Sequence, residues 1–400
     1  MLAPWLPWPP FDGGRIRMLE TLRFLSKRHE VTLLAHIHSE DERRHVDALR
    51  QYCKRVEVYA APDSPAHRIG TILLGLFRWR AAIQSVHFSS RLARRIAELT
   101  ATEDFDIVHM EFSFFAHYVA AISPTSRAKL ILSTHNIESE RLKRESRISP
   151  FGFRRLAVAV DGAFFPDWEE RAVQLFDGVA AVSESDRAWI ADRTHDVEVA
   201  LAPNGVDTLG FASRDERSAS TTNIVFTGVM DYPPNVDAVA WFAREIWPLL
   251  RKRKPDAQLL IVGARPTPAV AALGQHEGIT VTGAVEDIRP YVAGALTFVV
   301  PLRSGGGTRL KILQAMAIGC PVISTAIGAE GLAVTDGEDI LLAETPEDFV
   351  TQVLALERSP QLARRIGAAG RALVAKQYDW SACLAGIQSL YDRVLRTSTP

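Results

Sequence analysis

Apolar runs of four or five residues alternate with longer amphipathic segments throughout the second half of the chain. Strands that alternate with helices in this way form a parallel sheet, which helices cover on both faces. The segment 236–251 has the apolar spacing of a helix, and Pro248 should kink it near its end. The pattern therefore predicts an α/β domain, with strands at 224–227, 258–262, 279–282, 296–300, 321–324 and 339–342.

The first half alternates in the same way, but less regularly. Its amphipathic first helix follows a glycine pair at 13–14, and only residues 1–8, interrupted by Pro4 and Pro7, could form a strand before it. Either that strand is very short or the sequence starts late. Residues 39–42 have the spacing of a capping box and predict the start of another helix. The remaining predicted strands are 30–37, 55–61, 106–112, 129–135 and 178–183.

The length of 400 residues exceeds what one hydrophobic core usually organises, so two domains are expected. A polar stretch at 207–222 indicates the linker. We predict an N-terminal domain at 1–207, a C-terminal domain at 208–377, and a closing helix at 378–400 that returns to the first domain. The expected architecture is two doubly wound, Rossmann-like sheets that face each other across a cleft.

The composition excludes several classes of protein. A formal net charge of -1 argues against a nucleic-acid partner, which requires a basic excess. Three scattered cysteines fit a reducing compartment and no structural zinc. The longest apolar run, 69–77, is too short to span a membrane, and the N-terminus lacks the pattern of a signal peptide. We therefore expect a cytoplasmic protein.

The stretch 301–319 carries the strongest chemical signal. An apolar strand leads into three glycines and then into a helix, whose first turn holds Arg309 and Lys311. Cations at this end oppose the helix dipole unless an anion is bound, so the turn predicts a phosphate site. The alternative is a tight turn with two solvated cations. The spacing matches neither the P-loop nor the dinucleotide motif, so the expected nucleotide serves neither ATPase chemistry nor hydride transfer.

These motifs together resemble those of family 4 glycosyltransferases, which have the GT-B fold. The resemblance covers the whole chain and is closest to sugar transferases of bacterial exopolysaccharide systems. It rests on the stretches 301–325, 226–235, 203–207 and 378–380, and on the glycine pair. The family implies a hexosyltransferase (EC 2.4) that works with retention, without a cofactor or a bound metal. The donor would be a nucleotide-diphosphate sugar, a UDP-sugar in preference to a GDP-sugar, and the acceptor a growing polysaccharide or a lipid-linked glycan.

The resemblance also assigns roles to particular residues. His135, Arg309 and Lys311 would be catalytic. For His135 the alternative is an ordinary histidine at a strand end, and for Glu330, which could hold sugar hydroxyls, it is a carboxylate that caps a loop. The residues expected to bind the donor are Gly13, Gly14, Gly228, Gly306, Gly307, Thr308, Gln314 and Glu330.

Two positions depart from the family pattern, which has glutamates where this chain has Gly306 and Gln314. The second glutamate would hold the ribose hydroxyls of the donor. Glutamine can still form hydrogen bonds there, although without the strength that a charge adds. The change implies either weaker donor binding or an inactive copy. Asp104 and Asp106 match a metal-binding motif of the other glycosyltransferase fold, but they open a strand, so we expect no metal site.

Two other functions stay open: a nucleotide-sugar 2-epimerase of the same fold, and a non-catalytic GT-B subunit that binds a partner transferase. The segment 68–95 adds a further question, because it interleaves arginines with large apolar residues and contains no acid. Such a segment either lies on an anionic membrane surface or packs on the core with a solvated basic face. The first alternative would place the protein peripherally on the inner face of the cell membrane.

Overall fold

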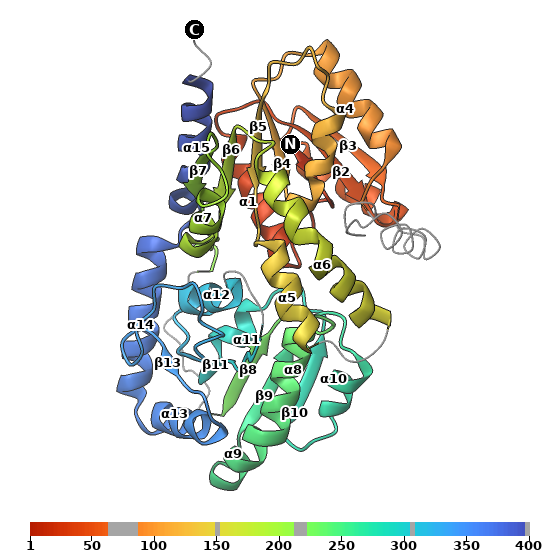
Figure 1. Ribbon diagram of the computed structural model, residues 1–400. Coiled ribbons are helices and arrows are strands. Elements are labelled where there is room, and N and C mark those ends of the chain that lie inside the picture. Colours follow the sequence, from red (N-terminus) through yellow and green to blue (C-terminus); the bar gives the residue numbers. More distant parts are fainter. Residues whose placement is uncertain (63–86, 149–152, 212–221, 305–308, 397–400) are drawn as a thin grey trace. The chain divides into compact units, whose positions relative to one another are not determined.

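The structure is a computed structural model that describes residues 1–62, 87–148, 153–211, 222–304 and 309–396 (Figure 1). The chain forms two compact units, Met1–Pro203 with Leu384–Pro400, and Asn204–Cys383. Each unit contains one parallel sheet with helices around it, as the alternating pattern predicts. The units divide at 203/204 and 383/384, where the sequence suggested 207/208 and 377/378.

The first unit contains a seven-stranded parallel sheet in the order β3-β2-β1-β4-β5-β6-β7. Its strands are β1 (Leu2–Ala3), β2 (Thr32–Ile37), β3 (Arg55–Ala60), β4 (Ile107–Glu111), β5 (Lys129–Ser133), β6 (Gly178–Ala181) and β7 (Glu198–Leu201). Its helices are α1 (Gly13–Leu25), α4 (Ser90–Thr102), α5 (Glu138–Ile148), α6 (Phe153–Val173) and α7 (Glu184–Ala191), with 3-10 helices η1 (Glu40–His45), η2 (Asp47–Leu49) and η3 (Ser113–Ala121). Figure 1 shows α5 and α6 running side by side.

Strand β1 is two residues long and lies at the centre of the sheet, where Leu2 and Ala3 pair with β2 and Leu2 also pairs with β4. The capping-box prediction is wrong: Ser39 precedes a 3-10 helix and makes no side-chain capping bond. The Glu42 carboxylate instead accepts from the backbone N–H of His38 at 3.0 Å and lies 3.4 Å from Arg15. Glu42, which the sequence pattern places in a capping box, therefore links η1 to the start of α1.

The second unit contains a six-stranded parallel sheet in the order β10-β9-β8-β11-β12-β13, the same winding as the first sheet. Its strands are β8 (Asn223–Thr227), β9 (Gln258–Val262), β10 (Ile279–Gly283), β11 (Thr297–Val300), β12 (Val322–Ser324) and β13 (Leu341–Leu342). Its helices are α8 (Pro233–Trp241), α9 (Trp247–Arg253), α10 (Pro268–Leu273), α11 (Arg289–Ala293), α12 (Leu310–Ile318), α13 (Pro346–Arg358) and α14 (Pro360–Gln377). All six predicted strands are present.

The helix predicted at 236–251 is interrupted, although not by a simple kink. A π-helical segment, η4 (Phe242–Ile246), separates α8 from α9, and the N–H of Trp247 donates five residues back to Phe242. Pro248 follows directly, and because proline has no N–H, the ladder must be rearranged around it. Helix α12 ends at Gly319 with φ 83°, the left-handed conformation that a glycine at a helix C-terminus commonly adopts.

The two short motifs at 203–207 and 378–380 meet inside the second unit. The N–H of Val206 donates to the carbonyl of Tyr378 at 2.7 Å, and the Thr208 hydroxyl donates to Asp379 at 2.8 Å. A Cβ on Gly205 would lie 2.8 Å from that same carbonyl, so glycine permits the close approach. Helix α15 (Trp380–Arg396) then carries the chain into the first unit, where Figure 1 shows it beside β7 and α7.

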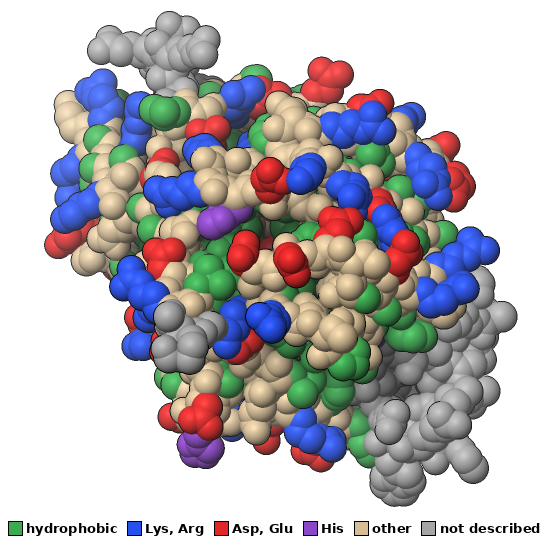
Figure 2. All heavy atoms as spheres, turned by 90° about the horizontal axis from the view of Figure 1, so that it is seen from above, with side chains coloured by type: hydrophobic (Ala, Val, Ile, Leu, Met, Phe, Trp, Pro, Cys, Tyr) green, Lys and Arg blue, Asp and Glu red, His purple; other side chains and the backbone are tan. Residues whose placement is uncertain are grey.

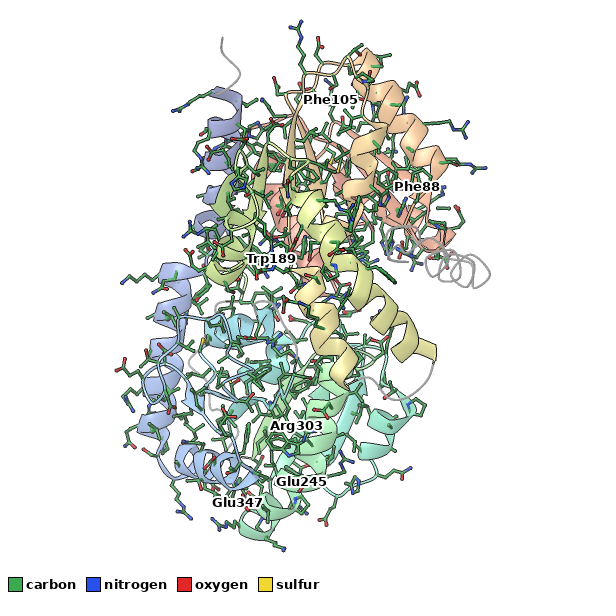
Figure 3. All side chains as sticks on the ribbon, in the orientation of Figure 1. Phe88, Phe105, Trp189, Glu245, Arg303 and Glu347 are labelled. Carbon is green, nitrogen blue, oxygen red and sulfur yellow. The ribbon has the colours of Figure 1, made fainter. Side chains whose placement is uncertain are left out.

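Most of the segment 68–95 lies outside the described residues. Its last part begins α4, whose Leu92 and Ile96 are buried in the core while Arg91 and Arg94 are exposed. Phe88, labelled in Figure 3, is 46% exposed and stacks on Tyr118. Basic and acidic side chains are interspersed over the face seen in Figure 2. Among the described residues, no helix has the length and apolar composition needed to cross a bilayer.

Candidate functional site in two parts

Each sheet has a point where the strand order reverses, and ligands of doubly wound proteins bind beyond the carboxyl ends of the strands there. In the second unit this point lies between β8 and β11, and in the first unit between β1 and β4. The predicted site residues that the structure describes follow these strands or their immediate neighbours. We describe the two groups separately.

Lys311 lies in the first turn of α12, which follows β11. Its ammonium donates to the Asn235 side-chain carbonyl at 2.8 Å and lies 4.1 Å from the centre of the Phe226 ring. Burial, reinforced by the charge of Arg309, lowers the pKa of Lys311 from 10.5 to about 7. The hydrogen-bond acceptor of the Lys311 ammonium is thus a neutral amide, and a bound anion would stabilise its charged form.

Arg309 is the N-cap residue of α12 and is 7% exposed. Its guanidinium donates to the carbonyl of Ile327 at 3.3 Å, in the loop that also carries the exposed Glu330. Gln314 lies half-buried one turn along α12 from Lys311. The structure thus brings Arg309, Lys311 and Gln314 onto one helix start. The predicted Gly306, Gly307 and Thr308 lie outside the described residues.

Gly228 follows β8 and lies beside Asn235 and Lys311. A Cβ at this position would lie 2.7 Å from the Asn235 amide nitrogen and 2.9 Å from the Lys311 ammonium, so any side chain would displace one of them. Two nearby cations are already neutralised: Arg265 pairs with Asp231 at 2.7 Å, and Arg303, labelled in Figure 3, pairs with Asp237 at 3.0 Å. Arg309 and Lys311 therefore supply the charge here.

In the first unit, His135 lies two residues beyond β5 and is 7% exposed. Its Nε2 is 2.7 Å from Glu111, the last residue of β4, and the other oxygen of that carboxylate is 3.2 Å from His109. Burial would raise the pKa of Glu111, but its hydrogen bonds with the two histidines hold the pKa well below the usual range. Glu111 is therefore a buried anion shared by two imidazoles.

Burial and the neighbouring charges shift the pKa of His135 in opposite directions. Burial lowers the pKa of His135, Glu111 raises it, and Arg17 of α1 lowers it again. Arg17 is only 1% exposed, which is rare for an arginine and places its charge close to the imidazole. Since burial dominates, the imidazole is neutral near pH 7.

Phe112 follows Glu111 with φ 70° and ψ 136°, a backbone conformation that bulky side chains rarely adopt. Its ring stacks on His135 at 3.7 Å with an angle of 15° between the planes. Such strain costs on the order of 1–3 kcal/mol and persists only where the surroundings impose it. The strained residue thus fixes the plane of the His135 imidazole.

The glycine pair begins α1, where the Asp12 side chain accepts from the N–H of Arg15 at 2.9 Å. Gly13 is exposed, whereas a Cβ on Gly14 would lie 3.2 Å from the Phe112 ring. Gly14 therefore provides room for the ring that supports His135. Gly13, Gly14 and the predicted histidine all belong to the first unit.

Sequence reasoning missed Glu111, Phe112, Arg17 and Glu169. His109 and Glu111 are two residues apart on one strand and so share a face, and Glu111 ends that strand at the reversal point. This position was the available signal for Glu111. Nothing in the local pattern marks Phe112 or Glu169, because their roles depend on contacts with distant segments.

Glu169 of α6 anchors the turn that follows His135. Its fully buried carboxylate accepts from the N–H groups of Glu138 and Ser139, both at 2.9 Å, and from the Ser113 hydroxyl at 2.7 Å. It thus caps α5 from another helix. The same turn joins His135 to α5, so this carboxylate supports the site from behind.

We expect Glu169→Ala to lower the free energy of unfolding by about 3 kcal/mol, because three buried donors lose their acceptor. Glu169→Gln should cost less, since an amide oxygen still accepts. The matched control is Glu170→Ala, which removes a surface pair with Arg193 and should cost less than about 1 kcal/mol. Urea unfolding measures all three, and a Glu169→Ala variant as stable as the control would contradict the capping role.

Among the described residues, no cluster of three or more His, Cys, Asp or Glu side chains could hold a metal ion. The described residues offer cations at a helix start in the second unit, and a histidine hydrogen-bonded to a buried carboxylate in the first. Two doubly wound parallel sheets, one of them with cations at a helix start, fit the GT-B class of glycosyltransferases.

Comparisons with known proteins agree. The model described as Glycosyltransferase Family 4 matches residues 11–208, and the model described as Glycosyl transferases group 1 matches 221–359. An uncharacterized protein in the cps region of Klebsiella pneumoniae is 22% identical, over 93% of this chain and 94% of its own. The phosphatidyl-myo-inositol mannosyltransferase of Mycobacterium leprae is 24% identical, over 79% of this chain and 81% of its own. The solved Anabaena HepE in complex with UDP has the same fold, with a TM-score of 0.61 and 14% identity over 99% of this chain and 98% of that one.

This chain belongs to the family 4 glycosyltransferases and has the GT-B fold. The predictions of family, fold and enzyme class are therefore confirmed. The individual site residues stay predictions that the geometry now makes specific.

Proposed function

We propose that this glycosyltransferase transfers a hexose with retention from a nucleotide-diphosphate sugar to a growing polysaccharide or a lipid-linked glycan. The observation that carries the proposal is Lys311, an ammonium with a lowered pKa at the start of α12, beside the side-chain-free Gly228. The leaving nucleoside diphosphate accumulates negative charge at the transition state. Preorganised cations and N–H dipoles stabilise such charge most strongly where water is excluded.

In this proposal Lys311 and Arg309, with Gly306, Gly307 and Thr308, take over the role that a divalent ion has in other transferases. Gln314 holds the ribose and Glu330 the sugar hydroxyls. Gly13 and Gly14 belong to the donor contacts. His135 acts on the transferred sugar near the reacting carbon, and its neutral state suits hydrogen bonding with hydroxyl groups.

A UDP-sugar is the preferred donor, which the UDP bound to Anabaena HepE supports. The acceptor class is supported by two relatives: one is named for the cps region, and the other for transfer to phosphatidyl-myo-inositol. A cytoplasmic location, with peripheral attachment to an anionic membrane through the segment 68–95, fits a lipid-linked acceptor and stays a prediction of the sequence.

A thermal-shift panel of nucleoside diphosphates and their sugars tests the donor, because a bound ligand raises the melting temperature by mass action. UDP and a UDP-sugar should give the largest shifts. If no nucleoside diphosphate binds at about millimolar concentration, a free energy near −4 kcal/mol, the proposed donor site is wrong.

Incubation with nucleotide sugars alone then separates the competing functions. A transferase hydrolyses its donor slowly at most, an epimerase converts it without an acceptor, and a non-catalytic subunit does neither. Once an acceptor is found, the anomeric configuration of the product, read by proton NMR, tests retention. An inverted linkage would overturn that part of the proposal.

Gln314→Glu should tighten donor binding by no more than about tenfold, because one neutral hydrogen bond to the ribose gains a charge. Donor titration by calorimetry measures the change, and Gln361→Glu on the exposed start of α14 is the matched control. No change in the Gln314 variant would show that this side chain does not hold the ribose.

A further inference from the structure

Four buried side chains of the first unit form a continuous hydrogen-bonded chain. Tyr391, on the C-terminal helix α15, lies 2.7 Å from Nδ1 of His109, and Nε2 of His109 lies 3.2 Å from Glu111. The other oxygen of Glu111 lies 2.7 Å from Nε2 of His135. None of the four side chains is more than 7% exposed. The chain thus joins a helix near the end of the sequence to the histidine of the candidate site.

The electrostatics give every hydrogen bond in this chain a direction. Burial and the charge of Glu111 raise the pKa of Tyr391 well above 10, so its hydroxyl keeps its proton. An ionised carboxylate can only accept, so Nε2 of His109 carries the proton that faces Glu111, and Nδ1 of His109 is left to accept from the Tyr391 hydroxyl. Glu111 is ionised and accepts from both histidines, so His135 also carries its proton on Nε2.

We propose that Tyr391, His109 and Glu111 are positioning residues that fix the tautomer of His135, with its proton on Nε2 and an acceptor lone pair on Nδ1. Nδ1 makes no hydrogen bond to any residue in the described part of the chain. Nδ1 of His135 can therefore accept a hydrogen bond from a ligand, and we assign this bond to a hydroxyl group of the transferred sugar. This last step rests on the proposed function, whereas the tautomer itself does not.

Replacing the Glu111 carboxylate with an amide tests whether this hydrogen-bonded chain fixes the tautomer of His135. A carboxylate accepts from two imidazoles, but the amide of Glu111→Gln accepts from only one and donates to the other. One of the two histidines must therefore move its proton to Nδ1. If His109 reversed, the Tyr391 hydroxyl would have to accept from its Nδ1–H, and the Tyr391 proton would then lack an acceptor among the described residues. The reversal therefore falls on His135, whose Nδ1 makes no hydrogen bond to any described residue.

Long-range proton–nitrogen NMR of the full chain, labelled in its histidines, reports both tautomers directly. The His109 and His135 signals are identified by their loss in His109→Asn and His135→Ala. We expect Nε2–H at both residues in the natural protein, and Nδ1–H at His135 in Glu111→Gln. If His135 keeps Nε2–H in Glu111→Gln, the proposal is overturned.

Tyr391→Phe alone provides a test that does not depend on the folding of Glu111→Gln. It should shift the Nδ1 signal of His109, and an unchanged signal would show that Tyr391 donates nothing there. The control is Tyr118→Phe, which removes a buried hydroxyl that lies 3.0 Å from a backbone carbonyl and 3.4 Å from His36, outside this chain. It should leave both tautomers unchanged.

Turnover separates the positioning role from the proposed function. A reversed histidine tautomer can cost on the order of 10⁴ in turnover in serine proteases, so Glu111→Gln should lose at least about 100-fold. Donor affinity should stay level. Reversal by NMR without any loss of turnover would leave the chain intact and remove the role of His135 in the reaction. A loss of turnover without any change of tautomer would mean structural damage only and overturn the proposal.

Discussion

Lys311→Ala should reduce sugar transfer about 100- to 1000-fold while the fold stays intact, because one preorganised cation is lost from the leaving diphosphate. In the empty protein this ammonium is partly desolvated and opposes the dipole of α12, so its removal should leave unliganded stability level or slightly higher. A loss of activity without a loss of stability distinguishes this variant from a packing defect.

The pH dependence follows from the same residue. With a folded-state pKa of about 7 against an ordinary value of 10.5, unliganded Lys311 binds fewer protons than the unfolded chain does between these two pH values. Its contribution to stability therefore rises as the pH rises from about 7 toward 10.5, and is lost as the pH falls back to 7. Lys311→Ala should flatten this rise.

Diphosphate binding should show the opposite trend. The anion requires the charged ammonium, so binding above pH 7 takes up a proton, and affinity should fall by up to about tenfold per pH unit. Calorimetry in buffers of different ionisation enthalpy measures the proton uptake, which should vanish in Lys311→Ala. Free UDP titrates near pH 6, so the slope is measured above pH 7.5.

Arg303→Ala is the matched control, because it removes a cation from the same glycine-rich stretch that is exposed and already paired with Asp237. It should retain most of the activity. If Lys311→Ala retains transfer within about threefold, a barrier change below roughly 1 kcal/mol, the diphosphate is not held at this helix start.

The fold was predictable because the alternation of strands and helices is local. The strands around the reversal points are buried on both faces and therefore carry continuous apolar runs. Strand β7 was missed; it is an edge strand of four residues, most of them half-buried. The capping box at 39–42 failed because Glu42 found stronger partners in His38 and Arg15.

The site was predictable where its parts are close in sequence, as for Gly228 or the helix that begins at Arg309 and Lys311. The partners of His135 were not, because they depend on strand register. Glu111 pairs with Ser133 across β4 and β5, which places His135 diagonally beyond it. The contact of His109 with Tyr391 spans 282 residues, and no spacing rule reaches that far.

The second large effect concerns His135 itself. His135→Ala should lower turnover about 100-fold, since a positioned side chain that assists at the transition state contributes about 10²–10⁴. Donor affinity should change little, because the proposed cationic contacts of the diphosphate, Arg309 and Lys311, belong to the second unit and the histidine to the first. A fall in kcat with level KM would show an interaction that is stronger in the transition state than in the ground state.

The control for this variant is His117→Ala, a histidine of the same unit whose Nδ1 lies 2.8 Å from the carbonyl of Phe114. It should lower stability but not turnover. Loss of His135 also frees the Glu111 carboxylate and the strained Phe112 ring, so His135→Gln is needed as a second variant that keeps a donor to Glu111. The Gln variant should hold Glu111 in place and still lose turnover, because an amide cannot reproduce the Nδ1 acceptor at the same position. Wild-type turnover in His135→Gln would show that His135 has only a structural role, which is to hold the Glu111 carboxylate in place.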